Sequence, residues 1–131
     1  MNKIIWVVFG VLVVVGAGFL LYQNKSADIS VSEPRANAKI TSPLTINGEA
    51  VGSWYFEAVF PIRLWTDDNL LIAQTSGQAQ EDWMTSKKVP FNAELIFPAQ
   101  PAGTTGKLVF QKDNPSGLPQ NDKSYSIKVR F

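Results

Sequence analysis

The stretch from Trp54 to Trp65 constrains the fold of this chain more than any other, because apolar residues alternate along it. A period of two places successive side chains on opposite faces of a β-strand. Twelve residues at about 3.3 Å each would span roughly 40 Å, which is long for a strand. We therefore predict a long central strand with one buried face, and we expect Pro61 at a bulge or an open edge because it has no N–H to donate. The predicted buried face consists of Trp54, Phe56, Ala58, Phe60, Ile62 and Leu64, and the opposite face of Tyr55, Glu57, Val59, Pro61, Arg63 and Trp65.

The composition narrows the chemistry that the chain can perform. Its 131 residues include no cysteine and no histidine, which excludes disulfides, thiolate ligands, lipoprotein attachment and imidazole acid–base catalysis. Residues 28–131 contain ten of the twelve Lys and Arg and all eleven Asp and Glu, so their formal net charge is −1. This charge gives no electrostatic case for binding nucleic acid. We predict that the chain is not an enzyme and holds no cofactor and no metal.

The N-terminal segment predicts a membrane anchor. Residues 4–22 are nineteen residues without a charge, and as a helix they would span about 28 Å, close to the hydrocarbon thickness of a bilayer. Trp6 and Tyr22 stand near its ends, as interfacial aromatic residues do. The alternative is a cleaved signal peptide, although Lys25-Ser26-Ala27 is a poor cleavage site. We expect residues 1–27 to form one transmembrane helix and a short linker, with the N-terminus in the cytoplasm.

The linker and the remaining chain predict an extracytoplasmic β domain. The five linker residues 23–27 reach at most about 18 Å, so the domain should lie close to the membrane surface. After the anchor no helical periodicity is found, and short alternating segments are separated by turn residues. This spacing is typical of an antiparallel β-sandwich of about seven strands, immunoglobulin-like in size, over residues 28–131. The predicted strands cover 29–32, 43–50, 54–65, 70–75, 89–97, 108–112 and 125–131.

Six short pieces of the sequence form a recognisable ordered set, at 42–48, 54–62, 82–84, 89–91, 106–110 and 113–119. They run through nearly the whole of residues 29–131, and Phe56-Glu57 together with 113–117 is the most specific combination. In this order they resemble a known family, the immunoglobulin-like domain of bacterial spore germination proteins and other bacterial envelope proteins. The resemblance implies an immunoglobulin-like β-sandwich, no known catalytic activity and an interaction role at the cell envelope. It implies no defined ligand residues.

Three loops carry the candidate binding residues. In an immunoglobulin strand order the loops around 52–54, 81–83 and 113–122 gather at one end, and the first strand starts at that end, near the membrane. Loop aromatics and carboxylates are common in binding sites, but turn formation alone also explains Asp, Asn and Ser in such loops. We expect any partner surface on these loops rather than on the sheet faces. The candidate residues are Trp54, Glu57, Asp82, Trp83, Asp113, Asn114 and Ser116.

Three of these residues allow further interpretations. Glu57, in the predicted central strand, could be a buried acid with a raised pKa. Alternatively it faces solvent, or pairs with Arg63 or with a lysine from a neighbouring strand. Trp54 and Trp83 are candidates for stacking on sugar rings. The oxygen-rich loop positions 67–69, 113–114 and 121–122 also leave calcium as a minor alternative.

Two function classes follow from the sequence. The first is a membrane-anchored, non-catalytic domain that binds a protein partner at the bacterial cell envelope. The second is a module that binds carbohydrate, such as the peptidoglycan of the cell wall.

Overall fold

The computed structural model describes residues 28–131, and the predicted membrane span at 4–22 lies outside the described residues. Within 28–131 no helix has the length and apolar character needed to cross a membrane. This part of the chain forms eight strands and two short 3-10 helices. The strands are β1 (Ile29–Glu33), β2 (Ala38–Lys39), β3 (Leu44–Val51), β4 (Val59–Thr66), β5 (Leu71–Ala79), β6 (Lys88–Leu95), β7 (Thr105–Gln111) and β8 (Ser124–Arg130), and the 3-10 helices are η1 (Gly52–Trp54) and η2 (Pro119–Asn121).

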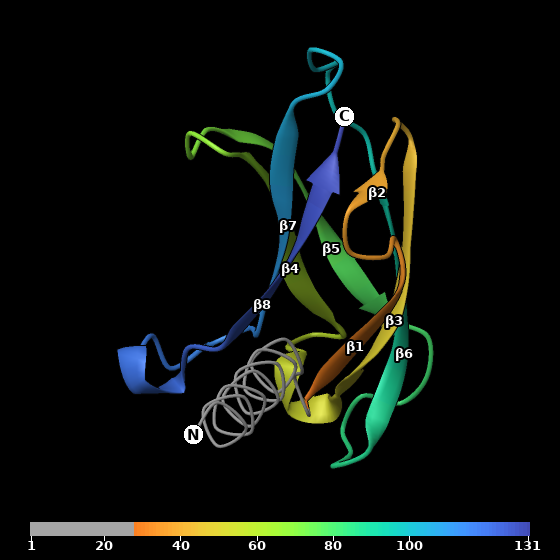
Figure 1. Cartoon of the computed structure of the whole chain (residues 1–131). Helices are drawn as coiled ribbons and strands as arrows, with labels where there is room; N and C mark the ends of the chain where they lie inside the picture. The colour runs from red at the N-terminus through yellow and green to blue at the C-terminus, as the bar shows by residue number, and fades with distance from the viewer. Residues whose placement is uncertain (1–27) are drawn as a thin grey trace, which may run out of the picture.

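The strands make two layers that face each other across the core (Figure 1). One layer contains β1, β3 and β6, the other contains β4, β7 and β8, and β5 is hydrogen-bonded to both. Strand β5 connects the two layers at Gln78, which pairs with Val59 of β4 and with Asn92 of β6. Pro61 pairs with β5 alone, because the β4–β7 ladder begins at Ile62. The predicted all-β antiparallel architecture is therefore confirmed.

An additional strand, β2, was not predicted. Its two residues pair in parallel with the end of β8, where Ala38 lies beside Val129 and Lys39 beside Arg130. A segment this short has no alternation that sequence analysis could detect. All other pairings in the described part of the chain are antiparallel.

The prediction of a single strand over 54–65 is wrong in its first half. The strand begins at Val59, and the preceding residues form η1 and a tight turn. Glu57 and Ala58 have φ angles of 51° and 67°, and Phe56 and Val59 exchange backbone hydrogen bonds of 2.9 and 3.2 Å on either side of them. Positive φ at both central residues is the geometry of a two-residue hairpin loop. The turn moves Phe56 out of the core, leaving it 44% exposed.

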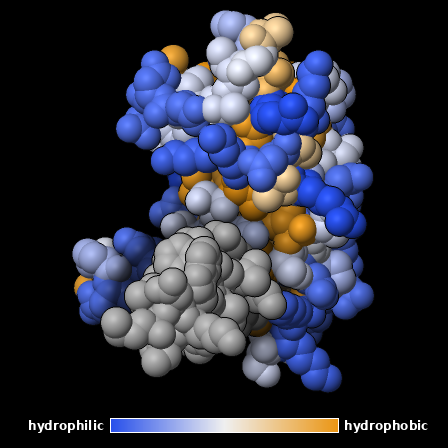
Figure 2. Space-filling model, in the orientation of Figure 1, coloured by the Kyte–Doolittle hydropathy of each residue, from blue (hydrophilic) through white to orange (hydrophobic). Residues whose placement is uncertain are grey.

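An aromatic cluster fills the core between the layers. The ring of Phe60 on β4 lies 4.9 Å from that of Phe91 on β6, edge to face, and thereby joins the two layers. Tyr55 and Trp54 also meet Phe60 edge to face, at 5.2 and 5.9 Å. The Tyr55 hydroxyl donates a hydrogen bond of 2.7 Å to the Val89 carbonyl, and burial raises the pKa of this hydroxyl far above its ordinary value. On the face drawn in Figure 2, hydrophobic surface shows mainly as a narrow band between hydrophilic side chains.

Candidate functional site

The connections β3–β4, β5–β6 and β7–β8 meet at the lower end of the sandwich in Figure 1, which we call the loop end. Backbone hydrogen bonds fasten them together: Gly52 N–H to the Lys87 carbonyl (3.1 Å) and Asp113 N–H to the Trp54 carbonyl (2.9 Å). The described chain also begins here, and its first carbonyl, that of Asp28, accepts from Val51 N–H at 2.8 Å. The loops therefore come together as the strand order predicts.

Asp28 holds the start of the domain against two of these loops. Its carboxylate accepts a hydrogen bond from Trp54 Nε1 at 3.4 Å and forms an ion pair with Lys123 Nζ at 3.1 Å. The hydrogen bond from Lys123 is the main reason why the pKa of Asp28 lies below its ordinary value, and partial burial opposes the shift. These contacts fix where a preceding segment joins the domain, namely at the loop end.

Trp54 cannot serve as a stacking platform for sugars. Its side chain is only 1% exposed, because η1 turns the ring into the core beside Phe60. Trp83 is half-buried and packs against the same core. Gly52 allows this close approach, since a Cβ at that position would lie 2.0 Å from the Thr85 carbonyl oxygen and 2.3 Å from that of Trp83. The aromatic residues of these two loops therefore help to close the core.

Glu57 is exposed, in the hairpin turn before β4. The interpretation as a buried acid in the central strand is wrong, because the chain reverses at this residue. The alternative that Glu57 faces solvent is confirmed. Arg63 does not pair with it and instead donates to Gln74 Oε1 (3.4 Å) and Gln111 Oε1 (2.7 Å) on the neighbouring strands.

The polar candidates of the β7–β8 loop bond mainly within their own loop. Asn114 Nδ2 donates to the Leu118 carbonyl at 2.8 Å and to Asp122 Oδ1 at 2.7 Å. Ser116 Oγ donates to Asn114 Oδ1 at 2.5 Å and accepts from Leu118 N–H at 3.2 Å. Such bonds are the turn chemistry expected of Asn and Ser. Their first role is to hold the shape of this loop.

The two candidate aspartates at the loop end also serve local structure. Asp82 Oδ1 accepts from Met84 N–H at 3.0 Å, which shapes the β5–β6 loop. Asp113 contributes its backbone N–H to the contact with Trp54 described above. At the opposite end, Asp67 accepts a hydrogen bond from Thr105 and Asp68 accepts one from Thr66, which lowers the pKa of Asp68. Within residues 28–131 no three carboxylates come together in a way that would hold a metal ion.

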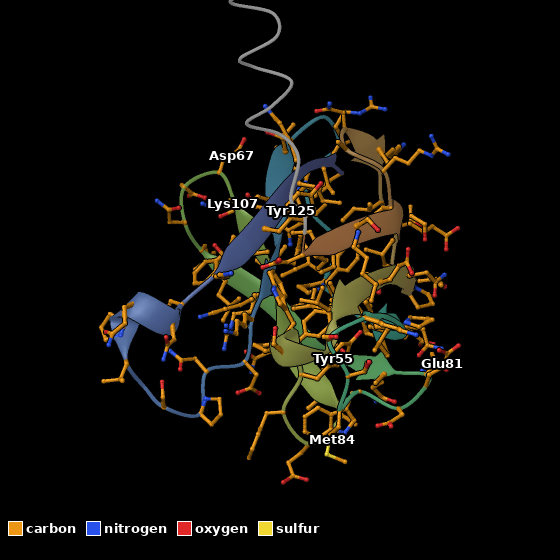
Figure 3. The ribbon with its side chains drawn as sticks, turned by 90° about the horizontal axis from the view of Figure 1, so that it is seen from below. Tyr55, Asp67, Glu81, Met84, Lys107 and Tyr125 are labelled. Atoms are coloured by element: carbon orange, nitrogen blue, oxygen red, sulfur yellow. The ribbon has the colours of Figure 1, made fainter. Side chains whose placement is uncertain are left out.

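Exposed apolar side chains are the loop-end feature that sequence reasoning missed. Phe56, Met84 and Leu118 are 44%, 75% and 48% exposed, and each belongs to a different one of the three loops. In Figure 3, Met84 and Glu81 point outward at the rim, whereas Tyr55 lies closer to the centre of the domain. The strand prediction placed Phe56 in the core. Met84 and Leu118 stand in segments that the sequence predicts to be loops, so their exposure could have been inferred from the sequence.

The fold and the loop arrangement agree with one comparison to known protein families. A family model described as the immunoglobulin-like domain of bacterial spore germination matches residues 28–117. That range includes β1 to β7 and two of the three loops at the loop end. No curated protein and no solved structure matched the chain.

Proposed function

The chain belongs to the family of immunoglobulin-like domains of bacterial spore germination, and from that premise we propose that it is an interaction domain anchored in the cell membrane. The family supports a binding role rather than an enzymatic one. Residues 4–22 would form the single span, and residues 28–131 would lie on the extracytoplasmic side. The partner is a protein of the cell envelope.

The three exposed apolar side chains at the loop end are the observation that carries this proposal. Phe56, Met84 and Leu118 project from separate loops at the end where residue 28 joins the domain. Complete burial of a side chain of this size contributes about 1.5–3 kcal/mol. Acidic side chains outnumber basic ones in these three loops by five to three: Glu57, Glu81, Asp82, Asp113 and Asp122 against Lys87, Lys112 and Lys123. The complementary partner surface is therefore apolar, with a basic rim, and close to the membrane.

The opposite end of the sandwich offers a matched control. Leu70 follows β4 and is 61% exposed, and Ile96 follows β6 and is 73% exposed. Leu70 and Ile96 are thus exposed to a degree similar to Met84 and Leu118, which are 75% and 48% exposed, and serine can replace each pair in turn. Of the two pairs, only Met84 and Leu118 lie at the loop end.

The test is crosslinking of the full-length protein in cells, followed by mass spectrometry of the captured proteins. We expect Met84→Ser with Leu118→Ser to reduce recovery of the partner at least tenfold, and Leu70→Ser with Ile96→Ser to leave it unchanged. A tenfold loss corresponds to about 1.4 kcal/mol, half or less of what two buried side chains contribute. Equal recovery with both double variants, or recovery of cell-wall glycan in place of a protein, would refute the proposal.

A further inference from the structure

Charge is segregated between the two layers of the sandwich. Strands β4, β5, β7 and β8 contain four cationic residues, Arg63, Lys107, Lys128 and Arg130, and no Asp or Glu. Strands β1, β3 and β6 contain three glutamates, Glu33, Glu49 and Glu94, and a single lysine, Lys88. We call the outer surface of the first set the basic face and that of β1, β3 and β6 the acidic face.

The four cations of the basic face point away from the core. Successive side chains of a strand point to opposite faces, and the neighbours of Lys107 and Lys128 along the chain are buried in the core. These buried neighbours include Leu108, Ile127 and Val129. Lys107 lies directly opposite Lys128 in the β7–β8 ladder and opposite Trp65 in the β4–β7 ladder. Like charges directly opposite each other on neighbouring strands destabilise a sheet. This arrangement therefore favours an external anion.

No carboxylate of the described residues neutralises these cations. Arg63 is bonded to two glutamine side chains, and Arg130 Nε donates to the Asn37 carbonyl at 2.8 Å. The ion pair found within 28–131 joins Lys123 to Asp28 and involves none of the four cations. Two acids lie at the ends of the face: Asp67 accepts a hydrogen bond from Thr105, the partner of Arg130 in the β7–β8 ladder, and Asp122 lines a hollow together with Arg63. Four cations against these two acids leave the basic face with a net positive charge that can attract a partner.

The acidic face carries the complementary charge and contains a hollow. Glu49 lies between Ser30 of β1 and Pro90 of β6, and Glu94 lies opposite Thr45 of β3. A shallow hollow of about 470 Å³ opens on this face. Its lining includes Ser30, Asn47, Glu49, Pro90 and Asn92.

We propose that copies of this domain associate side by side, with the basic face of one against the acidic face of the next. The two faces lie on opposite sides of the same sandwich (Figure 1), so one contact leaves a basic and an acidic face free. Such a head-to-tail contact generates a row of molecules rather than a closed pair. The upright arrangement of the row rests on the proposed membrane anchor, since all copies would then share one orientation. Surface ion pairs are individually weak, and confinement to a membrane raises the effective concentration that such an interface needs.

The absence of cysteine allows a direct test with introduced thiols. Ser126→Cys on the basic face and Asn92→Cys on the acidic face, made together in the full-length protein in bilayers, can be linked only between molecules, because the two positions lie on opposite outer surfaces. We expect a ladder of crosslinked species that weakens as salt rises.

Charge reversal makes the test specific to the faces. Lys107→Glu with Lys128→Glu cancels the four positive charges of the basic face, because two cations then stand beside two carboxylates. Glu49→Lys with Glu94→Lys changes the charge of the acidic face from −2 to +2, which gives a molecule with two basic faces. Each variant alone should lose at least tenfold of the crosslinked product, and an equal mixture of the two should recover it. Arg35→Glu with Lys87→Glu makes the same change in net charge as Lys107→Glu with Lys128→Glu, at positions outside the strands that define the two faces, and should crosslink like the parent. A thermal melt of each variant confirms that these exposed substitutions leave the fold intact.

The outcomes separate this inference from the proposed function. Undiminished crosslinking by the reversed variants, or no recovery on mixing, would overturn self-association. Absence of self-crosslinking together with binding of purified anionic wall polymer that is lost on Lys107→Glu with Lys128→Glu would overturn it too, in favour of a glycan partner. Flotation with liposomes tests the anchor separately. Recovery of the crosslinked product when the two reversed variants are mixed in detergent, at high protein concentration, tests self-association without the anchor.

Discussion

Replacing Gly77 with alanine tests how tightly β5 packs on the core. An ideal Cβ at Gly77 would lie 2.6, 2.8 and 3.0 Å from Cζ, Cε1 and Cε2 of the Phe60 ring. Phe60 is fully buried, and Tyr55 and Phe91 hold its ring edge-on at 5.2 and 4.9 Å, so it has no free space to move into. Overpacking of a core costs about 1–3 kcal/mol. We expect Gly77→Ala to lower the free energy of unfolding by that amount.

Phe60→Leu supplies the matching half of a double-mutant cycle. Leucine lacks the three ring carbons that a methyl group at position 77 would meet. Their loss should cost about 2 kcal/mol, at roughly 0.8 kcal/mol for each buried carbon group. In the Phe60→Leu background the methyl group added by Gly77→Ala occupies the space of the missing ring carbons. We therefore expect Gly77→Ala to lower the free energy of unfolding by less than about 0.5 kcal/mol there. The coupling between the two substitutions would then be roughly 1–2.5 kcal/mol.

The assay is urea unfolding of the full-length protein in detergent, followed by near-ultraviolet circular dichroism. A domain of this size has a free energy of unfolding of about 5–15 kcal/mol, so the single variants should remain folded. Ser76→Ala is the control, since Ser76 precedes Gly77 on β5, pairs with Pro61, and directs its side chain to the opposite face of the strand. If the costs of the two substitutions add to within about 0.5 kcal/mol, Gly77 does not pack on the Phe60 ring and the reasoning fails.

Three further perturbations probe the loop end. Tyr55→Phe removes the buried hydrogen bond to the Val89 carbonyl and should cost about 1–2 kcal/mol, lowering Tm by roughly 5–10 °C; an unchanged Tm would mean that this bond contributes nothing net. Asp28 has a folded pKa below its ordinary 3.8, so its contribution to stability is present above pH 3.8 and is lost as pH falls through the folded pKa. Asp28→Asn should remove that pH dependence, worth less than about 1 kcal/mol because the Lys123 pair is partly exposed, and identical acid-unfolding curves would count against the ion pair. Asn114→Ala deletes two hydrogen bonds inside the β7–β8 loop, and we expect faster proteolytic cleavage within 113–123 in a domain that otherwise stays folded; a cleavage rate equal to that of the parent would contradict the assigned role.

Alternation located the strands well wherever one face is buried and the strand is regular. Strand β3 and strands β6 to β8 lie close to their predicted places, because Ile46, Phe91, Leu108 and Ile127 all face the core with the expected parity. The same rule failed before β4, where Trp54 and Tyr55 are buried side by side and Phe56 is not. An alternating run of residue types cannot reveal a turn in which Glu and Ala adopt positive φ angles.

The candidate site was predictable in position but not in detail. Strand order alone placed the three loops together, whereas the internal bonding of Asn114 and Ser116 depends on distances that the sequence does not contain. The separation of charge between the two faces could not be predicted from the sequence either, because it depends on which strands are neighbours and on their register. Lys107 meets Lys128 and Trp65 only because β7 lies between β8 and β4.

The position of Asp28 has a mechanical consequence. The chain enters β1 at the loop end and runs upward beside β3, with the Asp28 carbonyl bonded to Val51. A pull on residue 28 from below is directed along the strand, so the β1–β3 hydrogen bonds carry the load together in shear instead of peeling apart one by one. The ion pair with Lys123 and the bond from Trp54 share that load with two other loops. A domain tethered in this way resists being unravelled from its own attachment point.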